Sequence, residues 1–301
     1  MLTPEKRTQL TYRYDSLRCC FQGVIESGVS SFVLLVAIRI FSAPNWLKAC
    51  IASSEKVGLF LNAITLTLGA GMKFRRISQL CAIYFLCVGI CWFGCCCAIN
   101  LWMFAIFAIL ANLCLSQQSP LMIEIYSLNY KAKERGRFLA TGLFLQGLIG
   151  IFFSKIGGYW LDCDLANFRA IFCAMAIAGL LCAASSFNVP SEPLRTTGNP
   201  KLFANFQLLW KDKLFGLMII SWTFLGLGNF MSIPVRVEYL ANPKYGINAT
   251  NNIVALITFI IPAISRLLSI KIWGIVFDRY HFIKVRILLN SFWIIGFLLY
   301  F

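Results

Sequence analysis

Long apolar runs separated by short polar loops dominate this chain of 301 residues. Of its residues, 59% are hydrophobic and 13% are charged, whereas a soluble domain is about half apolar and about a quarter charged. A run of roughly 20 apolar residues matches the thickness of the hydrocarbon core of a bilayer. Backbone N–H and C=O groups find no water there, so such runs must be helical. The sequence therefore predicts an all-α integral membrane protein.

The membrane-crossing helices can be placed from these runs. They are predicted over residues 18–40, 56–72, 77–98, 101–126, 138–160, 168–187, 214–234 and 251–277. The fourth helix is expected to break or kink near Pro120, because proline removes a helical hydrogen bond. A further run, 287–301, is shorter than the ~20 residues needed to span. We therefore expect the chain to stop inside a ninth helix.

A polar stretch rich in proline and glycine divides the chain. Residues 190–213 contain Pro190, Pro193, Gly198 and Pro200, a composition typical of a linker. Three parts follow: a six-helix N-terminal bundle at 1–189, a cytoplasmic linker at 190–213, and the start of a C-terminal bundle at 214–301. Within the linker, 202–210 is expected to form a short amphipathic helix on the membrane surface.

Basic residues predict the orientation, because cytoplasmic loops of membrane proteins are enriched in Lys and Arg. One side of the predicted membrane holds most of them: Lys6, Arg7, Arg13, Arg18, Lys73, Arg75, Arg76, Lys131, Lys133, Arg135, Arg137, Arg195, Lys201, Lys211, Lys213, Arg279, Lys284 and Arg286. The other side holds Arg39, Lys48, Lys56, Arg169, Arg236 and Lys244. The N-terminus and linker are therefore expected in the cytoplasm. This distribution accounts for the net charge of +15 without a nucleic-acid partner.

Metal, cofactor and enzyme chemistry find little support in the sequence. Most of the 13 cysteines lie inside apolar runs, where they behave as small hydrophobic residues. Cys87, Cys91 and Cys95 share a helix face, but no His or acid accompanies them, and a closed zinc site needs about four N or S ligands. The one histidine, His281, leaves no ordinary His-based triad. We expect no metal, no cofactor and no enzymatic activity.

The loop after the eighth run carries the most informative motif. It reads Gly274-Ile-Val-Phe-Asp278-Arg279 and continues to Lys284 and Arg286. Gly274 lets two helices approach closely, Asp278 suits the positive N-terminal end of the next helix, and the basic residues hold the loop in the cytoplasm. The pattern resembles the repeated cytoplasmic loop motif of the major facilitator superfamily, with His281 in place of the second glycine.

That superfamily repeats the motif between helices 2 and 3, where this chain reads Gly69-Ala-Gly71-Met-Lys73-Phe-Arg75-Arg76. The acid is missing, so Glu124 near the inner end of the fourth helix could pair with Arg75 or Arg76 instead. Glu134-Arg135-Gly136-Arg137 and Gly157-Gly158-Tyr-Trp160-Leu-Asp162 also resemble the superfamily. The resemblance implies a transporter of the bacterial inner membrane with unassigned substrate. Its conformational switch would involve Gly274, Asp278, Arg279, Arg75, Arg76, Glu124, Arg135 and Arg137.

A weak internal repeat points the same way. Arg39 precedes a proline at the end of the first helix, and Arg236 does so at the end of the seventh. The number of residues between the two loops with glycine and basic residues, at Gly69 and Gly274, is similar to the number between these two arginines. Two six-helix halves related by a parallel repeat would produce these spacings. Arg39 and Arg236 could gate the outer mouth or bind an anionic substrate, but interfacial snorkelling is the simpler interpretation.

Polar side chains within the spans are the candidates for substrate binding, because such groups are costly there and tend to be functional. Glu26 lies within the first helix, with Gln22 one turn earlier on the same face. Arg266 lies deep inside the eighth helix. Gln117 and Gln118 form a polar patch in the fourth helix, and helix-to-helix hydrogen bonding is their simpler role. Weaker candidates are Asn62, Asn112, Gln146, Trp222 and Asn229.

Two functions remain open. The first is a secondary active transporter that moves a small solute by alternating access, driven by a proton or cation gradient. The second is a non-transporting remnant, scaffold or sensor that retains the fold, which the missing acid between helices 2 and 3 and the end at Phe301 would favour. The partners expected in either case are the lipid bilayer and, for a transporter, a small-molecule substrate with a coupling proton or cation.

Overall fold

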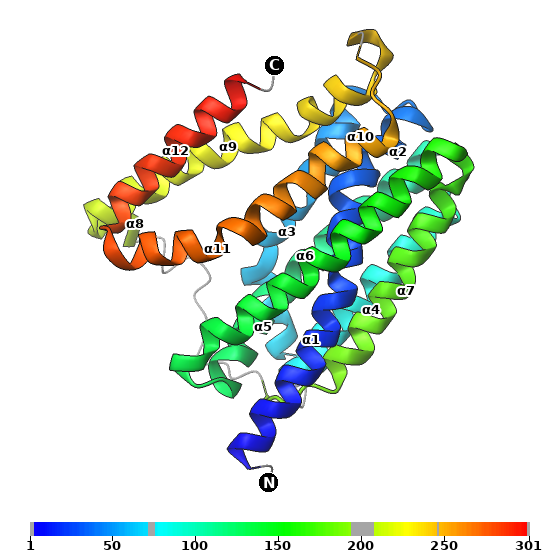
Figure 1. The fold of residues 1–301 in the computed structure, drawn as a ribbon. Coiled ribbons are helices and arrows are strands. Elements are labelled where there is room, and N and C mark those ends of the chain that lie inside the picture. Colours follow the sequence, from blue (N-terminus) through cyan, green and yellow to red (C-terminus); the bar gives the residue numbers. More distant parts are fainter. Residues whose placement is uncertain (1–2, 72–75, 194–207, 246, 300–301) are drawn as a thin grey trace.

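A computed structural model describes residues 3–71, 76–193, 208–245 and 247–299, and the regular elements it assigns there are helices (Figure 1). In chain order they are α1 (Pro4–Gly28), η1 (Val29–Val33), α2 (Leu34–Arg39), α3 (Asn45–Gly71), α4 (Ile77–Cys96), α5 (Leu101–Asn129), α6 (Ala132–Cys163), η2 (Leu165–Asn167), α7 (Phe168–Phe187), α8 (Leu208–Lys211), α9 (Lys213–Ala241), η4 (Pro243–Tyr245), α10 (Asn251–Ala255), η5 (Leu256–Ile260), α11 (Ile261–Arg279) and α12 (Phe282–Leu298).

Each predicted helix is present, but several extend well beyond their apolar runs. α1 begins at Pro4 rather than at Arg18, with Thr3 as its N-cap. Its first turns are largely exposed, and its buried polar residues begin at Thr11. α5 continues through Pro120 without the predicted break. Most of the amphipathic helix expected at 202–210 lies outside the described residues. The last run forms α12, and it ends at Leu298.

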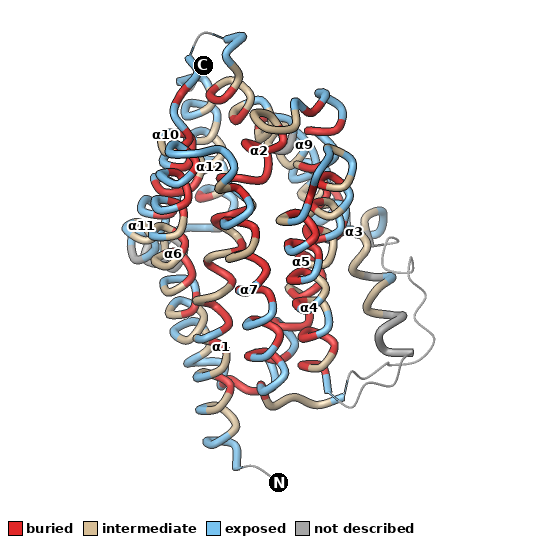
Figure 2. Tube along the Cα trace, turned by 90° about the vertical axis from the view of Figure 1, so that its right-hand side faces the viewer, coloured by how far each residue is buried: buried red, intermediate tan, exposed pale blue. Residues whose placement is uncertain are grey.

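We call the helices from α1 to α7 the N-terminal bundle (residues 4–187). Its centre is formed by α1, α4, α5 and α7, with α3 packed on α5 and α6 packed on α1. Figure 2 shows buried residues concentrated along these four helices. The centre is aromatic: Trp92 stacks on Phe172 with ring centroids 5.6 Å apart, and Phe104 meets Phe172 edge-on at 5.3 Å. Such pairs stabilise a core beyond the area they bury.

The helices from α9 to α12, the C-terminal helices (residues 213–298), lie against α2, α3 and α6 of the N-terminal bundle. We call the end that carries the N-terminus and the α5–α6 turn the base, and the end that carries α2 and the α9–α10 connection the apex. At the apex α10 packs on α6, and α9 packs on α2. Towards the base, α9, α11 and α12 diverge from α5 and α6 (Figure 1).

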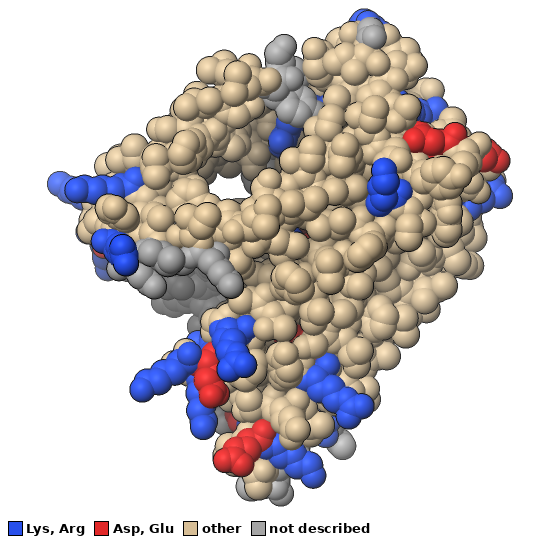
Figure 3. Space-filling model, viewed as in Figure 1, with Lys and Arg blue, Asp and Glu red and all other residues tan. Residues whose placement is uncertain are grey.

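Seven helical stretches in the described residues are long and apolar enough to cross a membrane: 4–39, 77–96, 101–129, 132–163, 165–187, 213–241 and 251–270. α3 is not among them, although it runs beside α5. On the face in Figure 3, charged side chains gather towards the ends of the helices and leave a broad uncharged band between them. This distribution suits a protein whose middle lies in lipid.

Candidate functional site

Glu26 lies where three helices meet. Gln22 on α1 donates its Nε2 to Glu26 Oε1 at 2.8 Å, and the side chain of Gln146 on α6 lies beside the same carboxylate. Arg266 on α11 lies within electrostatic reach of the same carboxylate. The structure thus brings together the predicted residues Gln22, Glu26 and Arg266. It adds Gln146, which the sequence placed among the weaker candidates.

Glycines on α1 and α6 allow α6 to lie close to α1 and to the C-terminal helices. The backbone oxygen of Gln146 lies against Gly23 of α1, where even a methyl group would collide with it. A Cβ on Gly150 would lie 2.6 Å from the Phe259 ring, and one on Gly147 would lie 3.3 Å from Leu267. α6 is therefore held between α1 and the C-terminal helices by a glycine-lined seam, the kind of contact that lets membrane helices pack tightly.

Two π-helical turns, η1 and η5, also face each other across this seam. Such turns occur often at functional sites, because the extra residue leaves the helical ladder irregular. Between them and α9 lies a cavity of about 230 Å³, lined in part by Ser30, Arg236 and Thr258. Arg266, predicted inside a span, is near Glu26, whereas Arg236, predicted at the outer end of a helix, lines this cavity.

A buried ion pair continues the polar contacts of Glu26 towards the base. Arg18 Nη2 lies 2.7 Å from Asp15 Oδ1, and both side chains are 5% exposed. Tyr126 of α5 donates its hydroxyl to Asp15 at 2.9 Å and accepts from Arg18 at 2.9 Å. The sequence prediction placed Arg18 among the loop cations, and that placement is wrong. The spacing of Asp15, Arg18, Gln22 and Glu26 along one helix face was the signal that could have revealed this row.

At the apex, Arg39 joins the N-terminal bundle to the C-terminal helices. Its Nη1 donates to Asn251 Oδ1 at 2.5 Å, and its Nε donates to the Ala241 carbonyl at 3.3 Å. Its Nη2 donates to the Ala249 carbonyl and to Asn248 Oδ1. Interfacial snorkelling, the interpretation favoured from the sequence, does not describe this residue. A planar guanidinium can satisfy several acceptors at once, and here they all belong to the C-terminal side.

Asp162 makes a second link at the apex. Its Oδ1 accepts the backbone N–H of Asn251 at 2.7 Å, and its Oδ2 accepts that of Asn252 at 3.1 Å. Asn251 in turn donates its side-chain amide to the Leu161 carbonyl at 3.0 Å. Lys155 donates to Asn252 Oδ1 at 3.1 Å. A carboxylate at a helix N-terminus satisfies its free N–H groups and its positive end, so α6 caps α10.

A third link pairs α3 with α9. Lys48 Nζ lies 2.5 Å from Glu238 Oε2, and Asn242 donates to Glu238 Oε1 at 2.6 Å. Lys48 is 7% exposed. The cavity beside these links, of about 980 Å³, is lined by polar residues from both sides, including Arg39, Asp162 and Glu238. The direct bonds between the two sides thus cluster at the apex.

Other predicted substrate residues lie elsewhere. Gln117 turns towards α3: its Nε2 donates to the Gly58 carbonyl at 2.7 Å, and its Oε1 accepts from Thr65. Gln118 is 7% exposed, and its Nε2 lies 3.5 Å from Ser119 Oγ. Asn229 lies on α9 and is half-buried. Gln117 is therefore a structural contact within the N-terminal bundle, and the structure does not join it to Glu26.

The predicted switch residues are only partly described. Arg75 lies outside the described residues, as do the side-chain surroundings of Gly274 and Asp278 on α11. Arg76, Glu124, Arg137 and Arg279 are exposed, and Arg76 forms no ion pair with Glu124 within the described part of the chain. Arg135 donates to the carbonyls of Ser127 and Tyr130 and so closes the α5–α6 turn.

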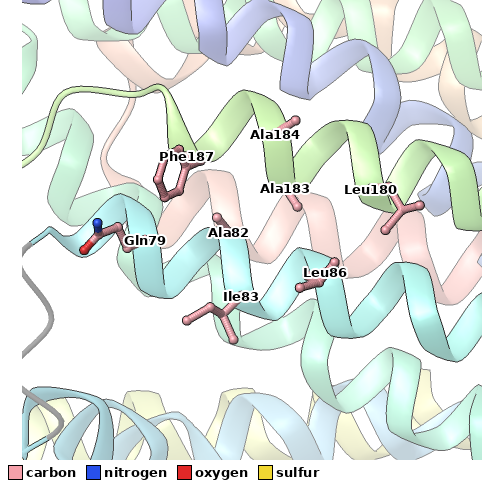
Figure 4. A pocket seen from close by; sticks show the side chains of 8 residues that line it. All are labelled: Gln79, Ala82, Ile83, Leu86, Leu180, Ala183, Ala184 and Phe187. Atoms are coloured by element: carbon pink, nitrogen blue, oxygen red, sulfur yellow. The ribbon is translucent and has the colours of Figure 1, made fainter.

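A groove of about 570 Å³ between α4 and α7 is a different kind of feature. Figure 4 shows its walls, which are almost wholly apolar, with Gln79 at one end. Ile83, Leu86 and Phe187 are well exposed there. The groove lies on the outer side of the N-terminal bundle, on helices that do not form the seam, and suits lipid rather than a polar solute. Within the described residues no group of three or more His, Cys, Asp or Glu residues could hold a metal ion.

Comparison with known proteins decides the family. The family model of the Major Facilitator Superfamily matches residues 57–301. This chain belongs to the Major Facilitator Superfamily. The predicted fold class, an all-α membrane protein of this superfamily, is confirmed. The superfamily and the seven apolar helical stretches place the protein in a lipid bilayer.

A solved structure shows the same fold. It is described as a bacterial homolog of the human lysosomal transporter Spinster, in an inward-facing and unoccupied conformation. The TM-score is 0.58 at 15% sequence identity, and the match covers 86% of this chain and 59% of that one. The chain therefore spans less than two thirds of the length of this structural relative. Comparison with curated proteins gives no match.

Proposed function

We propose that this member of the superfamily is a secondary active transporter that moves a small solute by alternating access, with Glu26 as the site of proton or cation coupling. The observation that carries the proposal is the position of Glu26, between α1, α6 and α11 at the seam of the two sides. Burying a carboxylate at membrane depth costs free energy, and the carboxylates found there tend to be functional. Here a cation from the other side of the seam, Arg266, lies within electrostatic reach of it.

The arrangement of contacts supports alternating access. Arg39, Asp162 and Lys48 bind the C-terminal helices at the apex, while the helices diverge towards the base. Breaking the apex links and closing the base would expose the seam to the opposite compartment. With the base in the cytoplasm, as the basic loops predict, the apex links form the closed outer gate.

Reconstitution into proteoliposomes tests the proposal. A panel of labelled small solutes, grouped as sugars, amino acids, organic anions and organic cations, is offered with and without an imposed pH or sodium gradient. Gradient-driven accumulation of one class is expected. Binding of a solute without accumulation under any gradient would contradict it and would favour the alternative, a scaffold or sensor. No enzymatic turnover of the solute is expected.

A further inference from the structure

We propose that the buried pair Asp15 and Arg18 is a positioning element that orients the side-chain amide of Gln22 towards the Glu26 carboxylate. The proposal rests on the coupling role proposed for Glu26 and adds two residues to it. The four side chains lie along one face of α1, at steps of three, four and four residues. Each is bonded to the next, and Arg18 donates its Nη1 to Gln22 Oε1.

The chemistry of the four groups determines the direction of every bond. An ionised carboxylate only accepts hydrogen bonds, and a guanidinium only donates them. Arg18 donates to Asp15 through Nε at 2.9 Å and Nη2 at 2.7 Å, so its Nη1 must meet an acceptor. Gln22 can offer only its Oε1 as an acceptor. Its Nε2 therefore faces Glu26, and it donates at 2.8 Å.

This direction affects the protonation of Glu26. A donor aimed at a carboxylate stabilises the charged form over the protonated form. With no donor at position 18, the Gln22 amide could turn over so that its oxygen accepts a hydrogen bond from the O–H of a protonated Glu26, since the two ends of an amide are nearly the same shape. Asp15 and Arg18 thus set, through Gln22, whether the ionised or the protonated form of Glu26 is favoured, although neither contacts Glu26.

Burial argues that the pair has a purpose beyond stability. Counted over the whole residue, Asp15 is 3% exposed, Arg18 4% and Gln22 5%. A buried ion pair is often no more stabilising than apolar residues of the same volume, because both charges lose their hydration. Tyr126 completes the pair by bonding to both charged groups. Its hydroxyl has no bond to Gln22, so it serves as the internal control.

Other polar and titratable groups around Glu26 are not substituted in this pair of changes. They are the side chain of Gln146 on α6, Arg266 on α11, Glu55 on α3, and the thiols of Cys19 on α1 and Cys182 on α7. Asp15 and Arg18 carry opposite charges, so replacing both by neutral residues leaves the net charge unchanged. Gln22→Met leaves both charges in place, so a shift that it shares with the double variant reports the lost orientation of Gln22 rather than a changed field.

Infrared titration of the whole purified chain in lipid nanodiscs tests this directly. The C=O band of protonated Glu26 is assigned by its loss in Glu26→Gln. In Asp15→Asn with Arg18→Met we expect its midpoint to move to higher pH by about one unit, a tenfold gain in proton affinity. Gln22→Met should give the same shift, and the triple variant no more than either, because interacting residues are not additive. Tyr126→Phe should leave the midpoint in place.

An unchanged midpoint in the double variant would overturn the proposal, as would a shift that adds in full to that of Gln22→Met. If the double variant is not monodisperse, Asp15→Asn with Arg18→Gln replaces it. That neutral pair keeps hydrogen-bonding groups in the bundle but no longer forces the direction, so an upward shift is still expected and its absence overturns the proposal. Proton binding needs no substrate. A shift without any uptake would therefore contradict only the transport function, and uptake without a shift would contradict only the positioning role.

Discussion

Asp162, at the apical end of α6, caps the N-terminus of α10 by accepting the backbone N–H of Asn251 at 2.7 Å. The two residues belong to opposite sides of the seam. In the proposed alternating-access cycle this bond must break when the apex opens, so its strength would contribute to the balance between the two states. The same is true of the bonds that Arg39 makes to Asn251 and to the carbonyls of Ala241 and Ala249.

Removal of the Asp162 carboxylate should favour opening of the apex. A lost helix cap costs about 1 kcal/mol, which corresponds to about fivefold in an equilibrium. A cysteine introduced at Ser30, in the cavity below the apex, should then react several-fold faster with an impermeant thiol reagent in Asp162→Ala, as measured peptide by peptide with mass spectrometry. Asp164→Ala is the control, because Asp164 caps only Ala166 within its own turn. Equal rates in the two variants would contradict the gate.

Arg39→Lys should weaken the same gate although it keeps the charge. Lysine is a point charge without the planar fork, so it cannot bind Asn251 and the two carbonyls together. We expect a lower Tm in detergent, by about 2 °C or more. Arg169→Lys provides the comparison, since Arg169 is exposed and lies over the Phe168 ring on its own side of the seam. A drop of the same size for both would mean that Arg39 acts only at the surface.

Glu26→Gln should uncouple uptake from the gradient. The amide keeps the size of the side chain but removes the charge and the exchangeable proton. We expect gradient-driven accumulation to fall by at least about tenfold, because an uncharged amide cannot release and rebind a coupling proton or bind a coupling cation as a carboxylate does. Solute exchange without a gradient should persist. Glu5→Gln, on the exposed start of the same helix, should accumulate solute normally. Full accumulation by Glu26→Gln would remove Glu26 from the coupling site.

Gly150→Ala should destabilise the seam. The added methyl would lie 2.6 Å from the Phe259 ring, and overpacking of this kind costs about 1–3 kcal/mol. Gly136→Ala on the same helix meets nothing within 4 Å. It should be neutral or stabilising by up to about 1 kcal/mol, because alanine is the better helix former. Thermal unfolding of both variants measures the difference. A Gly150→Ala protein as stable as Gly136→Ala would contradict the close approach of α6 and η5.

Part of the site could be predicted from the sequence because polar residues stand out within apolar runs. Glu26 and Arg266 were found in this way, and Gln22 followed from its spacing. Asp15 and Arg18 were missed because they do not lie within an apolar run: the charged residues of 1–18 resembled a loop. Gln117 was a prominent candidate, yet its amide is satisfied by Gly58 and Thr65 on α3. Hydropathy cannot tell a polar group facing a seam from one facing another helix of its own bundle.

The apolar runs alone predict a membrane protein of the all-α class, because roughly 20 apolar residues in a row can only be satisfied as a helix in lipid. Which polar groups meet depends on how the helices pack. Asp162 and Asn251 are 89 positions apart along the chain, and Arg39 and Asn251 are 212 apart. Such partners are set by the angles at which helices cross, and those depend on small residues such as Gly23 and Gly150 at each point of contact.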